Sequence, residues 1–83
     1  MNKLKEGTRI DASNLIEDRE YILKGNGAAV VKLLKKEESA WLFEVMDGEL
    51  SVGGQRKRKT ARVTIGVSQL PMASGLRWFP HPS

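Results

Sequence analysis

The chain contains no cysteine among its 83 residues. This absence excludes disulfide bonds, thiolate metal sites and a cysteine nucleophile. Histidine is almost as scarce, because the single His81 lies between two prolines close to the end of the sequence. A metal site would therefore consist of carboxylates alone, and a nucleophilic triad would have no credible base. We expect no metal or other cofactor, and we expect a protein that is not an enzyme.

Long apolar stretches are also missing. No run approaches the roughly 18 residues that a membrane-spanning helix requires, and residues 1–6 lack the apolar core of a signal peptide. The composition is 40% hydrophobic and 29% charged, which is typical of a globular domain. A chain of this length forms one domain. The sequence predicts a single cytoplasmic domain over residues 1–83, with no membrane partner.

Carboxylates are absent from the last part of the chain. Residues 1–52 hold 8 Lys and Arg against 10 Asp and Glu, a net charge of −2. Residues 53–83 hold 6 Lys and Arg and no Asp or Glu, a net charge of +6. This uneven distribution favours an anionic partner for the basic end of the chain.

Several segments have the pattern of short β-strands. Tyr21, Ile22 and Leu23 favour a strand over residues 20–24. Residues 60–65 alternate clearly, with apolar side chains at 61, 63 and 65 on one face. Two turn signals separate the segments, the glycine-rich triplet at 25–27 and the Asp-Gly pair at 47–48. A short strand is expected over 49–52.

Residues 28–46 fit two structures. As a helix, the apolar residues have fair 3.6-residue periodicity, and the domain would then be α+β. As a hairpin, two apolar runs flank five polar residues at 35–39. The helical stripe breaks at Glu37 and Glu38, and the second run concentrates Trp, Phe and Val. The hairpin is therefore preferred, with Trp41, Phe43 and Val45 facing inward.

About five short strands separated by turns predict a mainly β fold, most economically a small SH3-like or Tudor-like barrel over residues 19–70. A short N-terminal helix is expected from Asp11 or Ser13 through Asp18, with Leu15 and Ile16 buried. Three prolines, at 71, 80 and 82, predict an irregular C-terminal tail over 71–83.

The most informative segment is the run of four cations at 56–59. It belongs to residues 53–59, which are expected to form a flexible loop that adapts to a phosphate backbone. Hydroxyls on the outward face of the 60–65 strand could also bind phosphate oxygens. A solubilising loop and a site for an acidic protein surface remain open. The candidate nucleic-acid-binding residues are Arg56, Lys57, Arg58, Lys59, Thr60, Arg62 and Thr64.

A second group of residues could meet a protein partner. Leu42 and Met46 lie on the predicted solvent face of their strand, where the N-terminal helix or a partner could cover them. The sequence Arg77-Trp78-Phe79 could stack on bases or bind a partner, and it could equally pin the tail against the barrel. The candidate partner-binding residues are Leu42, Met46, Arg77, Trp78 and Phe79.

The sequence therefore favours a small non-enzymatic protein that binds the phosphate backbone of DNA or RNA with modest sequence specificity. The alternative is a protein-interaction module, such as a phage or mobile-element regulator that docks on a host protein through an apolar face. Self-association through an open edge of the barrel is compatible with either function.

Overall fold

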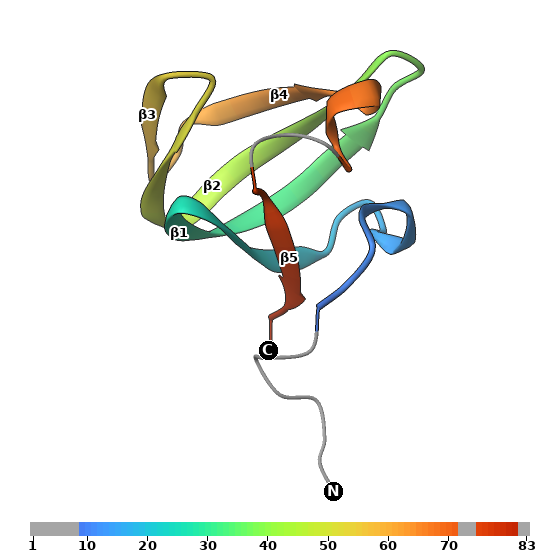
Figure 1. The fold of residues 1–83 in the computed structure, drawn as a ribbon. Helices are drawn as coiled ribbons and strands as arrows, with labels where there is room; N and C mark the ends of the chain where they lie inside the picture. Colours follow the sequence, from blue (N-terminus) through green and yellow to red (C-terminus); the bar gives the residue numbers. More distant parts are fainter. Residues whose placement is uncertain (1–8, 72–74, 82–83) are drawn as a thin grey trace, which may run out of the picture.

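The computed structural model describes residues 9–71 and 75–81. In these residues the order of elements is η1 (Ala12–Asn14), β1 (Glu20–Lys36), β2 (Ala40–Val52), β3 (Gln55–Arg58), β4 (Arg62–Gly66), η2 (Val67–Gln69) and β5 (Arg77–Pro80), where η marks a 3-10 turn (Figure 1). The mainly β prediction is confirmed, and so is the hairpin over 28–46. The described part of the chain contains no helix long and apolar enough to cross a membrane.

The five strands form one antiparallel sheet in which β2 has three neighbours. β1 pairs with β5 through residues 21–24 and with β2 through residues 26–36. The other edge of β2 is shared, because β4 pairs with residues 40–44 and β3 pairs with residues 49–52. Neither β3 nor β4 pairs with β5. The predicted closed barrel is therefore wrong: the sheet is strongly bent and remains open (Figure 1).

The two predicted turns at 25–27 and 47–48 are wrong as chain reversals, since both lie inside long strands. Gly27 pairs with Leu50 and Gly48 with Ala29, and both glycines have positive φ, +110° and +78°. A Cβ on Gly48 would lie 2.6 Å from the carbonyl oxygen of Ala28. The pairing also shifts between Val30 and Val31, as in a β-bulge. Left-handed residues and bulges bend these strands without reversing them.

A two-residue turn joins β2 to β3. Gly53 and Gly54 have φ of +59° and +80°, the signature of a type I′ hairpin turn. Val52 consequently pairs with Gln55, and the next three residues of β3 continue the ladder. The expected flexible loop at 53–59 is therefore wrong for residues 55–58, which form β3.

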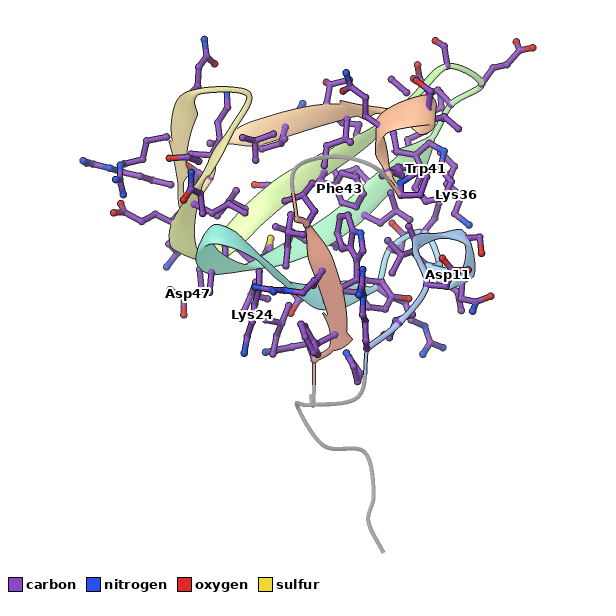
Figure 2. The ribbon with its side chains drawn as sticks, in the orientation of Figure 1. Asp11, Lys24, Lys36, Trp41, Phe43 and Asp47 are labelled. Atoms are coloured by element: carbon purple, nitrogen blue, oxygen red, sulfur yellow. The ribbon has the colours of Figure 1, made fainter. Side chains whose placement is uncertain are left out.

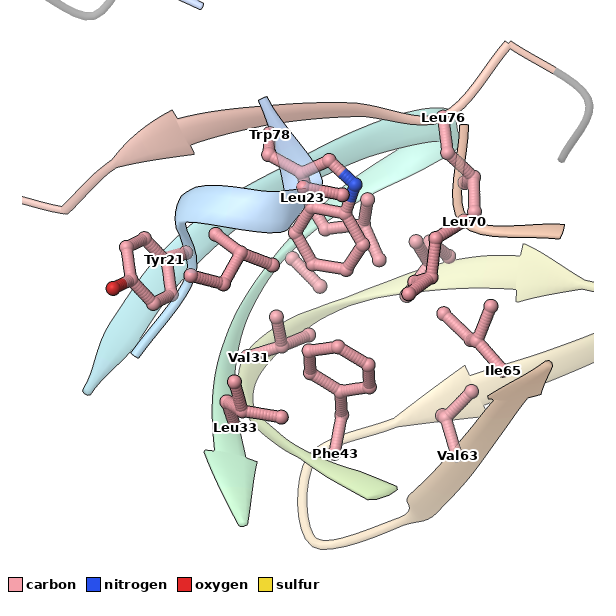
Figure 3. Packing of buried hydrophobic residues seen from close by; sticks show 14 of the residues in the cluster. Tyr21, Leu23, Val31, Leu33, Phe43, Val63, Ile65, Leu70, Leu76 and Trp78 are labelled. Carbon is pink, nitrogen blue, oxygen red and sulfur yellow. The ribbon is translucent and has the colours of Figure 1, made fainter. Parts of the chain in front are cut away.

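The hydrophobic core lies on the concave face of the sheet. Phe43 and Val45 are completely buried, as predicted, and Trp41 packs half-buried at the edge of the cluster. The rings of Phe43 and Trp78 stack with centroids 5.0 Å apart (Figure 3). Leu70 and Leu76 lie beside this stack, so segments distant in sequence cover the open side of the sheet.

The predicted N-terminal helix is wrong and is replaced by the single turn η1. Asp11 makes no capping hydrogen bond with its side chain, and a helix this short is unstable without one. Leu15 is buried, but Ile16 is 53% exposed. The Ile16 N–H donates to the Tyr21 hydroxyl at 2.9 Å, and the Asp18 N–H donates to the Leu33 carbonyl at 2.7 Å. These bonds hold the segment, which turns at Glu17 and Asp18, against β1.

The predicted irregular tail is wrong for residues 77–80, which form β5. Leu23 pairs with Trp78 and Ile22 with Phe79. The Ile10 N–H also donates to the Trp78 carbonyl at 2.7 Å, so residues from both ends of the described chain meet here. Burial of Trp78 in the core provides the non-local stabilisation that a sequence of four residues cannot carry by itself.

Candidate nucleic-acid interface

The cations of β3 divide between the two faces of the sheet. Successive side chains of a strand point to opposite faces. Lys57 pairs with the fully buried Leu50 and is itself half-buried, so it lies on the concave side. Arg56 and Arg58 lie on the convex side and are exposed. The four consecutive cations therefore do not all point to one face, whereas a flexible loop could have turned all of them toward one ligand.

Glu49 on β2 holds the two arginines of β3. Its Oε2 lies 2.6 Å from Nη1 of Arg56, and its Oε1 lies 3.3 Å from Nε of Arg58. The carboxylate thus bridges both guanidinium groups and fixes them side by side on the convex face. The arginine side chains remain 58% and 77% exposed, so they can still present hydrogen-bond donors to a ligand.

Lys59, Thr60 and Arg62 follow in the β3–β4 connection and at the start of β4. Thr60 was expected on a strand with Arg62 and Thr64, and this is wrong. It lies in a turn with φ of +76°, and its N–H donates to the Val45 carbonyl at 2.8 Å. Among the described residues, neither Lys59 nor Arg62 has an ion-pair partner within 4.0 Å, although Arg62 lies across the ladder from Glu44.

An open groove of about 610 Å³ lies between the β2–β3 turn and β4. Lys57 is the only charged residue of its lining, and none of the described lining residues is a carboxylate. The other residues supply amide and hydroxyl groups around a small apolar floor. They are Asn26, Ser51, Val52, Gly53, Gly54, Gln55, Val63, Thr64, Ile65, Gln69 and Leu76.

The structure places all seven predicted nucleic-acid residues on neighbouring segments. Each lies on β3, in the connection after it or on β4, and each has an exposed or half-buried side chain. Sequence reasoning missed Glu49 and the amides of the groove. The Gly53-Gly54 pair carried the missing signal, because a two-residue turn there sets Glu49 across from Arg58.

The candidate partner-binding residues are separated from one another. Trp78 is 2% exposed and Phe79 is 8% exposed, which supports the interpretation that the tail packs on the sheet. The ammonium of Lys24 lies 5.0 Å from the centroid of the Phe79 ring. Arg77 is exposed, and Leu42 and Met46 are half-buried on the convex side of β2. These residues do not form one exposed apolar surface.

The remaining polar features of the described chain are isolated. No group of three or more His, Cys, Asp or Glu side chains gathers among residues 9–71 and 75–81. His81 is half-buried, with Nδ1 3.5 Å from Oε1 of Glu20. Lys36 lies beside Trp41, with its Nζ 4.7 Å from the centre of the indole (Figure 2).

Comparison of the chain with protein-family models, with curated proteins and with solved structures gives no match. The fold and the candidate site define a class by themselves: a small antiparallel β protein with a bent, open sheet. Five of its 14 basic residues lie on β3, on β4 and in the short connection between these two strands.

Proposed function

We propose that this protein binds nucleic acid through the phosphate backbone, with β3, the β3–β4 connection and β4 as the contact surface. The observation that carries the proposal is the gathering of five cations on these adjacent segments. Three of them, Lys57, Lys59 and Arg62, have no ion-pair partner in the described chain. Exposed cations that are fixed near one another release counterions when they meet phosphates, and this release drives binding.

The cations of this surface differ in whether an acidic side chain already holds them. Lys59 and Arg62 are the phosphate contacts that need no rearrangement. Arg56 and Arg58 must share their donors with Glu49, so they contribute less per residue. The described convex face of β3 and β4 has no Asn or Gln side chain to read an adenine edge, and we assign its arginines to phosphates, so we expect modest sequence specificity.

The test removes together the two exposed cations that have no ion-pair partner in the described chain, Lys59 and Arg62. Changing Lys59 and Arg62 to Gln should reduce the magnitude of the slope of log affinity against log salt by about 2, because each phosphate contact on duplex DNA contributes roughly 0.9. The melting temperature should hardly change, since both side chains are exposed. Fluorescence anisotropy with labelled DNA and RNA of mixed sequence measures the slope.

The matched control removes two cations elsewhere. Arg19 and Lys35 are exposed and lie outside β3 and β4, so the Arg19→Gln, Lys35→Gln variant has the same net charge as the test variant. If both variants lose the same affinity, net charge attracts the nucleic acid and no particular surface binds it. If neither DNA nor RNA binds at low salt, the proposed function is wrong.

A protein partner is the second candidate function. The observation that favours it is the outer edge of β4, which pairs with no other described strand and offers backbone hydrogen bonds that phosphates alone would not fill.

A further inference from the structure

The outer edge of β4 carries backbone groups that no other described strand uses. The Val45 N–H donates to the Ala61 carbonyl at 2.8 Å, and the Val67 N–H donates to the Ser39 carbonyl at 2.9 Å. Hydrogen-bonded pairs recur at every second residue of an antiparallel ladder. The N–H and C=O groups of Val63 and Ile65 therefore point to β2, and those of Arg62 and Thr64 point away from the sheet.

The groove runs along this edge. Val63, Thr64 and Ile65 are consecutive and all three line it. Val63 and Ile65 point to the concave side of β4, so the groove opens on that side. The Thr64 side chain points to the other face, so Thr64 borders the groove through its backbone. The groove is thus a space beside unpaired backbone, where an extended chain could lie.

The charges around the edge decide what kind of chain fits. Lys57 lines the groove, and Arg62 lies on β4 itself. None of the described groove residues is acidic. On the concave side of the edge, the buried side chains of Val63 and Ile65 continue the core. A strand placed here would set alternate side chains beside Arg62 on one face and beside this apolar floor on the other.

We propose that β4 accepts an extended segment of a partner protein as an additional strand, and that this segment alternates acidic and apolar residues. The N–H and C=O groups of Arg62 and Thr64 supply the main-chain hydrogen bonds, as in other cases of strand addition. This site shares Arg62 and β4 with the proposed phosphate-binding surface, but it does not rest on that function, because it depends on backbone groups as well as on charge.

Amide hydrogen exchange tests the edge directly. In the free protein the amides of Arg62 and Thr64 should exchange quickly, and those of Val63 and Ile65 should exchange slowly. A labelled peptide of alternating valine and glutamate should bind and slow the exchange of Arg62 and Thr64. A peptide of alternating valine and lysine should bind at least roughly tenfold more weakly, because it repels the nearby cations.

Thr64 offers a matched pair of variants. Thr64→Pro removes the outward N–H without removing a hydrogen bond to β2, and edge strands accept proline at such positions. It should weaken binding of the valine–glutamate peptide roughly tenfold. Thr64→Val keeps the N–H and removes only the hydroxyl, so it should bind like the parent. Slow exchange at Val63 in both variants shows that β4 remains paired with β2.

Four results would overturn the proposal. The first is slow exchange of Arg62 and Thr64 in the free monomer, which would mean that the edge is already covered. The second is no binding of the valine–glutamate peptide. The third is protection of these amides by a DNA or RNA oligonucleotide and not by the peptide. The fourth is concentration-dependent protection in the protein alone, which would make a second copy of the chain the occupant. If Thr64→Pro does not fold, the exchange of the parent protein still decides.

Discussion

Phe43 links β2 to β5 in the core. It is completely buried on β2, and its ring stacks on the ring of Trp78, which belongs to β5. The stack adds about 0.5–1.5 kcal/mol to the burial of the two rings. The inward face of β2 was predictable, because alternation along a strand is a local property. The partner ring was not predictable, because nothing local relates residue 43 to residue 78.

Replacing Phe43 with Ala should lower the free energy of unfolding by about 3–5 kcal/mol, through lost burial and the cavity that remains. A small domain has only about 5–15 kcal/mol in total, so the variant should be largely destabilised. Urea denaturation followed by tryptophan fluorescence measures the change. The control is Glu44→Gln on the opposite face of β2, which should change stability little. A parent-like Phe43→Ala variant would contradict the core described here.

At the scale of elements, the bends in β1 and β2 decide how the sheet folds over its core. The sequence signals at 25–27 and 47–48 were right about the conformation, since Gly27 and Gly48 both have positive φ. They were wrong about the outcome, because a left-handed residue reverses a chain only when the flanking segments pair with each other. Here the flanking residues pair with a different strand, and that choice depends on contacts across the whole sheet.

The bend at Gly48 can be tested against the turn at Gly53. Both residues have positive φ, +78° and +59°, so alanine costs roughly 1–2 kcal/mol of backbone strain at either position. A Cβ at Gly53 meets nothing within 4 Å, whereas a Cβ at Gly48 meets the Ala28 carbonyl oxygen at 2.6 Å. Gly48→Ala should therefore cost about 1–3 kcal/mol more than Gly53→Ala, as overpacking does. Equal melting temperatures for the two variants would mean that the strands do not approach so closely at Gly48.

At the scale of the whole molecule, the charge asymmetry of the sequence is only partly kept in space. The acidic and basic parts of the chain meet where Glu49 bridges Arg56 and Arg58. Counting charges along the sequence identifies residues 53–83 as the basic part of the chain. It could not predict which cations a carboxylate would hold, because that depends on the register of β2 and β3. Whether the sheet closes into a barrel was unpredictable for the same reason, since closure depends on how the edge strands pair.

Glu49 therefore restrains the proposed phosphate contacts, and its removal gives the most direct test of that role. Glu49→Gln frees both arginines and removes one negative charge from the surface. Affinity for DNA or RNA at low salt should rise several-fold. The magnitude of the salt slope should rise by roughly 0.9 for each arginine that then meets a phosphate. Stability should fall by at most about 1 kcal/mol, because exposed ion pairs contribute little.

The control for Glu49→Gln is Glu37→Gln, which makes the same change in net charge at the β1–β2 turn, next to Lys35 and away from β3. If the two variants raise affinity equally, the effect comes from the field of the whole molecule, and Glu49 has no local role. If Glu49→Gln weakens binding, the carboxylate positions the arginines for the nucleic acid, because free guanidinium groups would then lose more in side-chain entropy than they gain in donors. A gain confined to Glu49→Gln, with an unchanged melting temperature, would place the two arginines of β3 within the binding surface. The carboxylate would then limit the affinity of that surface.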